Sequence, residues 1–274
     1  MTPMRSFRLQ PGRKVSLKDF DPASHEGFDR KEPALAEVHS LVSQLESLQE
    51  LLYAEHRHKV LVVLQAMDTG GKDGTIHRVF EGVNPQGVRV ASFKAPTPFE
   101  LDHDYLWRVH RQAPGKGELV IFNRSHYEDV LVVRVHNLAP REVWQRRYDQ
   151  INDFERMLAE EGTLVLKFFL HISRREQKQR LRERLEDRTK LWKYNPDDLK
   201  ERALWDNYME AYEDMLNKTT TGHAPWHIVP ADHKWYRDWV VAGSLVEALK
   251  GLKMEYPEPA FDVAAALRDF DRLA

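Results

Sequence analysis

Apolar residues recur every three or four positions over residues 34–56, and this spacing predicts a long amphipathic helix. Pro33 precedes the pattern, at a position where the first turn of a helix accepts proline. Residues 1–33 contain four prolines and show no sustained period. We expect them to form an N-terminal arm that packs on the domain.

Beyond this helix, short continuous runs of apolar residues alternate with helical patterns. Continuous β-branched and aromatic runs are typical of strands that are buried on both faces of a parallel sheet. The runs cover residues 59–66, 88–93, 118–122, 164–172 and 226–231. Helical patterns cover residues 75–81, 99–111, 141–160, 174–217 and 235–250, the fourth of them broken near Asn195 and Pro196. This alternation predicts an α/β fold with a doubly wound, mostly parallel sheet of about five strands flanked by helices.

Composition excludes several classes of protein. The 274 residues are 42% hydrophobic and include 12 Phe, 7 Trp and 9 Tyr, which is enough to fill a core and argues against disorder. The absence of cysteine excludes disulfide, zinc-thiolate and iron–sulfur sites as well as a cysteine nucleophile. No secretory signal and no apolar run of membrane-spanning length occurs, so we expect a soluble, cytoplasmic protein without membrane contact.

Charge is almost balanced over the whole chain, with 41 Lys and Arg against 43 Asp and Glu. A site for a polyanion must therefore come from local clustering of cations and not from the net charge.

The first predicted strand runs directly into a glycine-rich loop and then a helix, over residues 66–74 (AMDTGGKDG). Loops of this kind bind phosphate, because their backbone N–H groups and the helix N-terminus converge on the phosphate oxygens. Lys72 can reach a terminal phosphate. The glycines and the acidic residue that complete the expected phosphate contacts are Gly70, Gly71, Asp73 and Gly74.

This loop departs from the usual phosphate-loop pattern at two positions. Ala66 stands in place of the first glycine, and Asp73 replaces the Ser or Thr whose hydroxyl ordinarily binds Mg²⁺. The carboxylates of Asp68 and Asp73 flank Lys72 and are good Mg²⁺ ligands, so the metal shell is changed without being removed. The alternative is an ordinary glycine-rich turn that carries surface charges.

A second polar turn, NRSHYED at residues 123–129, follows the third predicted strand. It lies at the carboxyl edge of the sheet, where open α/β folds bind ligands. Arg124 is suited to phosphate, and Glu128 could accept hydrogen bonds from a nucleotide or hold metal-bound water. Asn123 stands where nucleoside-triphosphate enzymes often carry an acid. The alternative is a helix capped by Ser125, with Arg124 and Glu128 as surface charges.

Residues 174–193 form a basic segment with nine Lys or Arg and four acidic residues. Arg180, Arg184 and Arg188 recur every four residues, so on one helix they would form a stripe that can follow a chain of phosphates. Over residues 174–195 we therefore expect a helical lid that closes over phosphate and excludes water. The alternative is a solvated helix face.

Nucleic acid is a second polyanion that such a stripe could bind. Trp192 and Tyr194 lie near the lid and could stack on bases, but Trp205, Tyr208 and Tyr212 follow helical spacing and are expected in the core. The balance favours a chain of phosphates without bases.

Four segments in this order resemble the polyphosphate kinase 2 family: residues 66–74, 122–129, 180–193 and 224–237. The opening residues 7–22 are similar to that family's N-terminal arm, and the resemblance covers residues 5–250. It implies one P-loop kinase domain over residues 34–274, Mg²⁺ dependence with Mn²⁺ as a substitute, and reversible phosphoryl transfer between inorganic polyphosphate and nucleotides. The form with Asn123 and Glu128 resembles the subgroup that accepts both AMP and ADP.

On this resemblance, each group receives an expected role. Asp68 would bind Mg²⁺, Lys72 with the loop amides would bind the transferring phosphoryl group, and Arg124 would neutralise that group from the opposite side. Glu128 completes the expected catalytic set. Asn123, Glu128 and Lys234 are expected on the nucleotide side. Arg180, Arg184 and Arg188 are expected to hold polyphosphate.

Substrates and partners are expected accordingly: polyphosphate, AMP, ADP, ATP and guanine nucleotides, with no nucleic acid, and assembly into a homo-oligomer, either a dimer or a tetramer. Two other functions stay open. A nucleoside-monophosphate kinase that uses ATP would share the loop, lid and sheet, and a nucleic-acid-binding P-loop protein would use the lid on a phosphate backbone.

Overall fold

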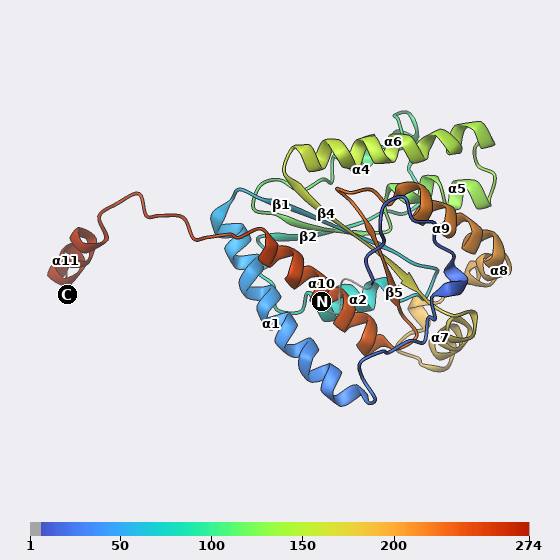
Figure 1. The fold of residues 1–274 in the computed structure, drawn as a ribbon, viewed down its shortest axis with the longest axis horizontal. Coiled ribbons are helices and arrows are strands. Elements are labelled where there is room, and N and C mark those ends of the chain that lie inside the picture. Colours follow the sequence, from blue (N-terminus) through green and yellow to red (C-terminus); the bar gives the residue numbers. More distant parts are fainter. Residues whose placement is uncertain (1–6, 274) are drawn as a thin grey trace.

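The computed structural model describes residues 7–273, and a single five-stranded sheet lies at its centre (Figure 1). The strands follow the order β2-β3-β1-β4-β5, and every neighbouring pair is parallel. The predicted α/β class with a parallel sheet is confirmed. The strands are β1 Lys59–Gln65, β2 Val88–Ser92, β3 Leu119–Asn123, β4 Thr163–His171 and β5 Trp226–Pro230.

The central strand β1 shows why a continuous apolar run is needed. It pairs with β3 on one side and β4 on the other, so both of its faces are covered by helices. Leu61 and Val63 face one core cluster, whereas Val60, Val62 and Leu64 face the other. Full burial of each such side chain contributes about 1.5–3 kcal/mol, and the strand therefore anchors both layers.

The helices cover the two faces of the sheet in separate groups (Figure 1). One core cluster contains side chains of α1, α2 and α10, and the other contains those of α6 and α9. These helices are α1 Lys31–Glu55, α2 Lys72–Val79, α6 Arg141–Glu160, α9 Trp205–Thr219 and α10 Lys234–Gly251. Trp205, Tyr208 and Tyr212 are buried on α9, as their spacing predicted.

Several helical predictions are wrong in their bounds. The helix expected at 34–56 begins at Lys31, so Pro33 lies within its first turn. The helix expected at 75–81 begins at Lys72, because Gly71 already serves as its N-cap. The stretch 99–111 forms two short helices, α3 Pro98–Leu101 and α4 Trp107–His110, because the Asp104 carboxylate accepts from the backbone N–H groups of residues 106 and 107 and so starts a new turn.

The basic segment 174–193 is not one continuous helix. Helix α7 covers Arg174–Glu186 and ends at Asp187, whose side chain accepts from the backbone N–H and hydroxyl of Thr189. Arg188 therefore lies outside the helix, and the predicted three-arginine stripe is wrong. A 3₁₀ turn (Leu191–Lys193) and α8 (Asp197–Ala203) follow, so the chain is also broken at Asn195 and Pro196, as predicted.

The two ends of the described chain differ in how they pack on the rest of the molecule. Residues 7–9 run antiparallel beside β5, with hydrogen bonds from Leu9 N to Trp226 O (2.8 Å) and from Ile228 N to Phe7 O (3.0 Å). At the other end, α11 (Val263–Leu273) stands apart from the body on an extended linker, and no sequence pattern had predicted it (Figure 1). None of the helices in the described part of the chain has the length and apolar character to cross a bilayer.

Candidate active site

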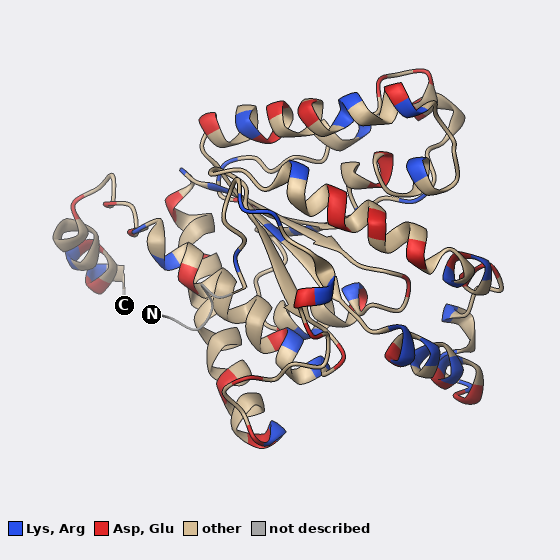
Figure 2. Cartoon of the chain, turned by 45° about the vertical axis from the view of Figure 1, so that its right-hand side comes forward, with Lys and Arg blue, Asp and Glu red and all other residues tan. Residues whose placement is uncertain are grey.

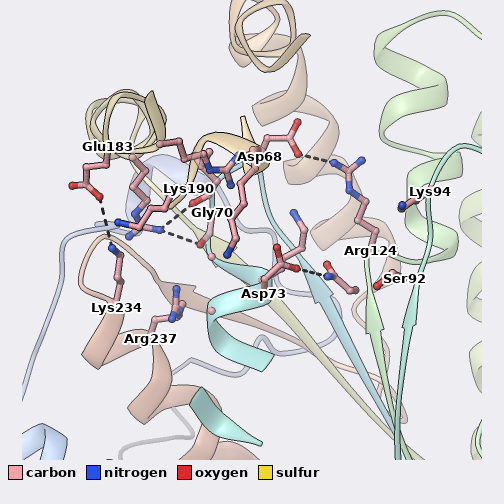
Figure 3. A pocket seen from close by; sticks show the side chains of 18 of the residues that line it. Asp68, Gly70, Asp73, Ser92, Lys94, Arg124, Glu183, Lys190, Lys234 and Arg237 are labelled. Atoms are coloured by element: carbon pink, nitrogen blue, oxygen red, sulfur yellow. Dashed lines mark hydrogen bonds and ion pairs between the residues drawn. The ribbon is translucent and has the colours of Figure 1, made fainter. Parts of the chain in front are cut away.

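A cavity of about 700 Å³ opens at the carboxyl ends of β1, β2 and β3. Nine cationic and three acidic side chains line it, and they come from the loops after these strands, from α2, α7 and α10, and from the segment that follows α7 (Figure 3). We name this cavity the phosphate pocket. Figure 2 shows that Lys and Arg gather on α7, beside it. The charged lining consists of Lys72, Lys94, Arg124, Arg180, Arg184, Lys190, Lys193, Lys234, Arg237, Asp68, Asp73 and Glu183.

The glycine-rich loop lies at the base of the phosphate pocket. Gly71 has a φ of +106°, in the left-handed region, and its Cα faces the Arg237 guanidinium so closely that a Cβ would collide with it. Gly70 is equally confined, because a Cβ there would meet the side chain of Ala66 and the carbonyl of Met67. Gly71 is thus required for its backbone geometry and for the close approach, and Gly70 for the close approach alone.

Lys72 is the first residue of α2 and is buried at the mouth of the loop. Its Nζ donates to the carbonyl oxygen of Ala66 at 2.8 Å. Burial, followed by the neighbouring Arg124 guanidinium, lowers the pKa of Lys72 to about 8. A phosphate bound in this pocket would place negative charge beside the ammonium and favour its protonated form.

Arg124 joins the second turn to the loop. Its Nη2 donates to Asp68 Oδ1 at 2.6 Å (Figure 3). Its Nη1 lies 3.7 Å from Glu128 Oε2. Burial raises the pKa of the Glu128 carboxyl, and Arg124 opposes that rise. The structure therefore brings together Asp68, Lys72, Arg124 and Glu128, the four residues that the sequence singled out for catalysis.

A second contact ties the two loops at their other side. The amide of Asn123, the last residue of β3, donates from Nδ2 to Asp73 Oδ1 at 2.6 Å. Asp73 and Asn123 both line the phosphate pocket.

Arg180 does not stand free on a helix face as the sequence suggested. It is 5% exposed, and its guanidinium donates to the carbonyl oxygens of Thr69 and Gly70 in the loop at 3.2 and 3.3 Å. The same group also donates to the carbonyls of Ala231 and Asp232 after β5, at 2.6 and 3.0 Å. Arg180 thus fixes the loop backbone to the neighbouring segment, and its donors are occupied by the protein.

The other lid residues are distributed differently. Arg184 lines the phosphate pocket and donates to the Lys193 carbonyl (3.0 Å) and to the Asp198 carboxylate (3.2 Å). Arg188 is exposed and does not belong to the lining. Lys234 is exposed at the rim, with Nζ 3.9 Å from a Glu183 carboxylate oxygen.

Two cations of the pocket received no role from the sequence. Arg237 is 3% exposed and ion-paired with Asp238, and it follows Lys234 by three residues on α10, a spacing that places both on one helix face. Lys94 comes directly after β2, at the edge where ligands bind in parallel sheets. The sequence thus contained a signal for each residue: the helical spacing from Lys234 for Arg237, and the position after a strand for Lys94.

A second cavity of about 410 Å³ adjoins the first, and no motif had indicated it. We name it the apolar pocket. Phe93, Lys94, Ala95 and Arg124 belong to both cavities. About half of its remaining lining residues are apolar. The charged ones are Glu100, Arg108, Glu128, Asp129 and Arg147, and burial raises the pKa of Asp129 to about 6. Its apolar members outside the shared wall are Pro96, Leu101, Val132, Val133, Leu138 and Ala139.

The acidic residues fit a magnesium ion that is shared with substrate. Asp68 and Asp73 both line the phosphate pocket, beside the loop. Within residues 7–273, no three His or acidic residues cluster as a complete protein-borne metal shell. Mg²⁺ commonly takes one or two carboxylates and completes its shell with water and substrate phosphates.

Taken together, a cationic cavity with loop amides and carboxylates opens beside an apolar cavity, and Arg124 lies between them. Phosphoryl transfer needs this kind of arrangement, because catalysis depends mainly on alignment of donor and acceptor and on neutralisation of charge.

Comparison with known proteins agrees with this arrangement. A family model described as Polyphosphate kinase 2 matches residues 29–257. The chain is 62% identical over 257 residues to the AMP/ADP-polyphosphate phosphotransferase of Meiothermus ruber, covering 93% of this chain and 96% of that protein. It is 42% identical over 266 residues to the ADP-polyphosphate phosphotransferase of Rhodopseudomonas palustris, covering 93% and 92%. The crystal structure of polyphosphate kinase 2 from Arthrobacter aurescens TC1 superposes with a TM-score of 0.95 at 44% identity, over 100% of this chain and 98% of that one.

Proposed function

The chain belongs to the polyphosphate kinase 2 family, and from this premise we propose that it transfers phosphate between inorganic polyphosphate and both AMP and ADP. The observation that carries the proposal is the junction at Arg124, where a cavity lined by nine cations meets an apolar cavity. A polyphosphate chain suits the first cavity, because each of its units carries negative charge. A nucleotide suits the junction, because its base needs apolar surface and its phosphates need cations.

The chemistry follows from the positions of the four central side chains. Lys72 and the loop amides would bind the phosphoryl group in transfer, and Arg124 would stabilise the equatorial charge from the opposite side. Glu128, which is close to Arg124 at the entrance of the apolar pocket, would orient the nucleotide together with Asn123. The transfer is direct between the two substrates, so no covalent intermediate on the protein is needed.

Mg²⁺ would be held by Asp68, and Asp73, which lines the same pocket, would take part in its shell. When bound, the ion supplies positive charge to the phosphate oxygens. In Asp68→Asn, the amide keeps the shape of the side chain and loses its charge. We expect a higher Mg²⁺ concentration for half-maximal activity and a loss of roughly tenfold or more in kcat. An unchanged Mg²⁺ requirement in a folded variant would exclude Asp68 as a ligand.

The cations expected to contact polyphosphate differ from the three arginines that the sequence suggested. Arg184, Lys190 and Lys193 would contact the polyphosphate chain directly, since they line the cavity. Arg180 would act on it indirectly, through the loop carbonyls that it holds. Lys234 would contribute from the rim.

The decisive experiment compares phosphate donors and acceptors in parallel. Purified protein with Mg²⁺ is incubated with polyphosphate and, separately, with AMP, ADP, GMP or GDP, and the products are separated by ion-exchange chromatography. We expect ADP and ATP from the adenine nucleotides. Replacement of polyphosphate by ATP should remove the product from AMP, and a protein that prefers ATP as donor would instead be a nucleoside-monophosphate kinase.

Use of guanine nucleotides and of ATP in the reverse direction, substitution of Mn²⁺ for Mg²⁺, and assembly into a dimer or tetramer stay predictions of the family resemblance. The same assay tests the first three, and light scattering coupled to size-exclusion chromatography tests the fourth.

A further inference from the structure

Beneath the turn that carries Arg124 and Glu128, a group of polar side chains is completely removed from solvent. Glu155 of α6, Lys167 of β4, and His126 and Tyr127 of the turn itself are each 0% exposed. None of them lines the phosphate pocket or the apolar pocket. We name these four residues the buried polar cluster.

The Glu155 carboxylate is the centre of this cluster. Its Oε1 accepts from the Tyr127 hydroxyl at 2.7 Å and lies 3.2 Å from His126 Nε2, while its Oε2 accepts from Lys167 Nζ at 2.6 Å. Lys167 Nζ also donates to the Tyr127 hydroxyl at 2.8 Å and to the Thr219 carbonyl at 2.7 Å. All three protons of the ammonium therefore have acceptors, which is the condition for burying a charge.

Stability alone does not account for such a cluster. A buried ion pair can often be replaced by apolar residues of similar volume without loss, since desolvation of two charges offsets their attraction. The ion pair instead fixes the orientation of the groups that bond to it, because a buried charge is satisfied in only a few geometries. Here the orientation is imposed on two consecutive residues of the turn, His126 and Tyr127.

The turn itself needs such support. Arg124 has a φ of +61°, a left-handed conformation that costs free energy for a residue with a side chain. The next residue, Ser125, is buried, and its Oγ accepts from Gln65 Nε2 at 3.1 Å and from the Tyr127 N–H at 3.2 Å. Residues 125–127 are thus attached to the interior one after another, and their neighbours on either side, Arg124 and Glu128, are the ones that face the pockets.

We propose that Glu155 is a positioning residue for the phosphoryl transfer: through Tyr127 and His126 it sets the backbone of the turn, and thereby the placement of Arg124 and Glu128. Lys167 compensates the Glu155 charge and orients the carboxylate. The inference rests on the proposed function for its kinetic consequence, but its structural consequence, an ordered turn, does not depend on which substrates are used.

The first test uses a pair of matched variants. Tyr127→Phe removes the hydroxyl between Glu155 and Lys167, whereas Tyr148→Phe removes the hydroxyl of another buried tyrosine, which lies on α6 and accepts from Arg134. We expect Tyr127→Phe to lower kcat about tenfold or more with little change in KM for polyphosphate, because displaced Arg124 fails chiefly in the transition state. We expect the melting temperatures of the two variants to fall by similar amounts, because each loses one buried hydroxyl. Tyr148→Phe should nevertheless retain kcat.

Hydrogen exchange of the amides at residues 124–128 provides a readout that does not depend on activity. We expect at least about tenfold faster exchange there in Tyr127→Phe and unchanged exchange in Tyr148→Phe. Equal exchange and equal kcat in the two variants would overturn the inference. If the parent protein fails to use polyphosphate, the proposed function fails, while the exchange comparison still decides the role of the cluster.

A rescue experiment covers the case in which Tyr127→Phe does not fold. His126→Leu removes the ring nitrogen that lies against Glu155, whereas His126→Gln places an amide N–H near the same position. We expect His126→Leu to lower kcat about tenfold and His126→Gln to recover most of that loss. Equal activity of the two variants contradicts a positioning role.

Discussion

The two pockets that meet at Arg124 are built from opposite kinds of surface. The phosphate pocket has nine cations, contributed by loops and by two helices from distant parts of the sequence. The apolar pocket has apolar walls from residues 93–101 and 132–139, and its four cations and three acidic residues nearly balance in charge. One surface acts through its summed electric field, which falls off gradually, and the other acts through shape, which is sensitive to single atoms.

This difference has a consequence for what each pocket can recognise. A field from many cations accepts any part of a repetitive anion, so the phosphate pocket should tolerate polyphosphates of different lengths. A shaped apolar surface discriminates between ligands by the atoms that fill it. Single charge substitutions should therefore change binding of polyphosphate gradually, except where a group touches the phosphoryl in transfer.

The strongest test of that exception is Lys72→Ala. Lys72 is buried at the loop, and its removal takes away a preorganised charge at the reacting group. We expect kcat to fall at least about 10²-fold while the melting temperature stays close to that of the parent. Steady-state kinetics and thermal unfolding check both points, and a folded variant with near-normal turnover would refute the loop assignment.

The pKa of Lys72 predicts a pH dependence. The pKa of about 8 means that the free enzyme loses this charge as the pH rises above 8, so kcat/KM for polyphosphate should fall by up to tenfold per pH unit from there. Between this value and the usual 10.5, the unfolded chain binds more protons than the folded one, and the lysine makes the free energy of unfolding rise with pH. A kcat/KM that stays level from pH 8 to 9.5 in a protein that remains folded contradicts the assignment.

Among the cations that line the phosphate pocket, Arg184 should have a moderate effect on KM for polyphosphate when it is changed to Ala. Its guanidinium lines the phosphate pocket, whereas Arg182 on the same helix is exposed outside it and pairs with Glu186. We expect KM for polyphosphate to rise several-fold in Arg184→Ala with little change for ADP. The difference from the parent should shrink at high salt, because the screening length falls from about 8–10 Å near physiological salt to about 3 Å at 1 M. Arg182→Ala is the matched control. A rise in KM for ADP alone would show that Arg184 faces the nucleotide.

The smallest expected effect concerns the apolar pocket. Leu101 lines it but is 67% exposed, so Leu101→Ser removes only part of an apolar contact. We expect KM for AMP to rise about threefold, with KM for polyphosphate unchanged. Leu199→Ser, on α8 and similarly exposed, is the control for a general surface effect. Equal KM values for the two variants would remove the apolar pocket from nucleotide binding.

Local pattern predicted the strands and the phosphate loop well, because their signals lie in adjacent residues. The run at residues 59–66 is buried on both faces in β1, and the loop that follows it starts a helix as expected. Helix ends were predicted less well. The end of α7 at Glu186 depends on one side-chain cap, Asp187 with Thr189, inside a segment whose charge pattern continues unchanged.

The roles of single arginines could not be deduced from spacing. Arg180 and Arg184 have the same residue type and helical phase, but Arg180 is buried by carbonyls of Thr69 and Ala231, which are far away in the sequence. The apolar pocket escaped prediction for a similar reason: its walls come from separate segments, and of these only the turn at residues 123–129 carries a recognisable motif. The tertiary contacts that decide such features have no local signature.

The central position of β1 also bears on how the protein is made. The strand that leads into the phosphate loop lies early in the chain, but its two neighbours, β3 and β4, extend to residues 123 and 171. A nascent chain therefore exposes an apolar strand without any partner until β3 is complete at residue 123, and closure of these long loops slows sheet formation. Until residue 171 has left the ribosome, β1 lacks one of its two neighbours, so the loop acquires its final support late and such partial chains are prone to aggregate.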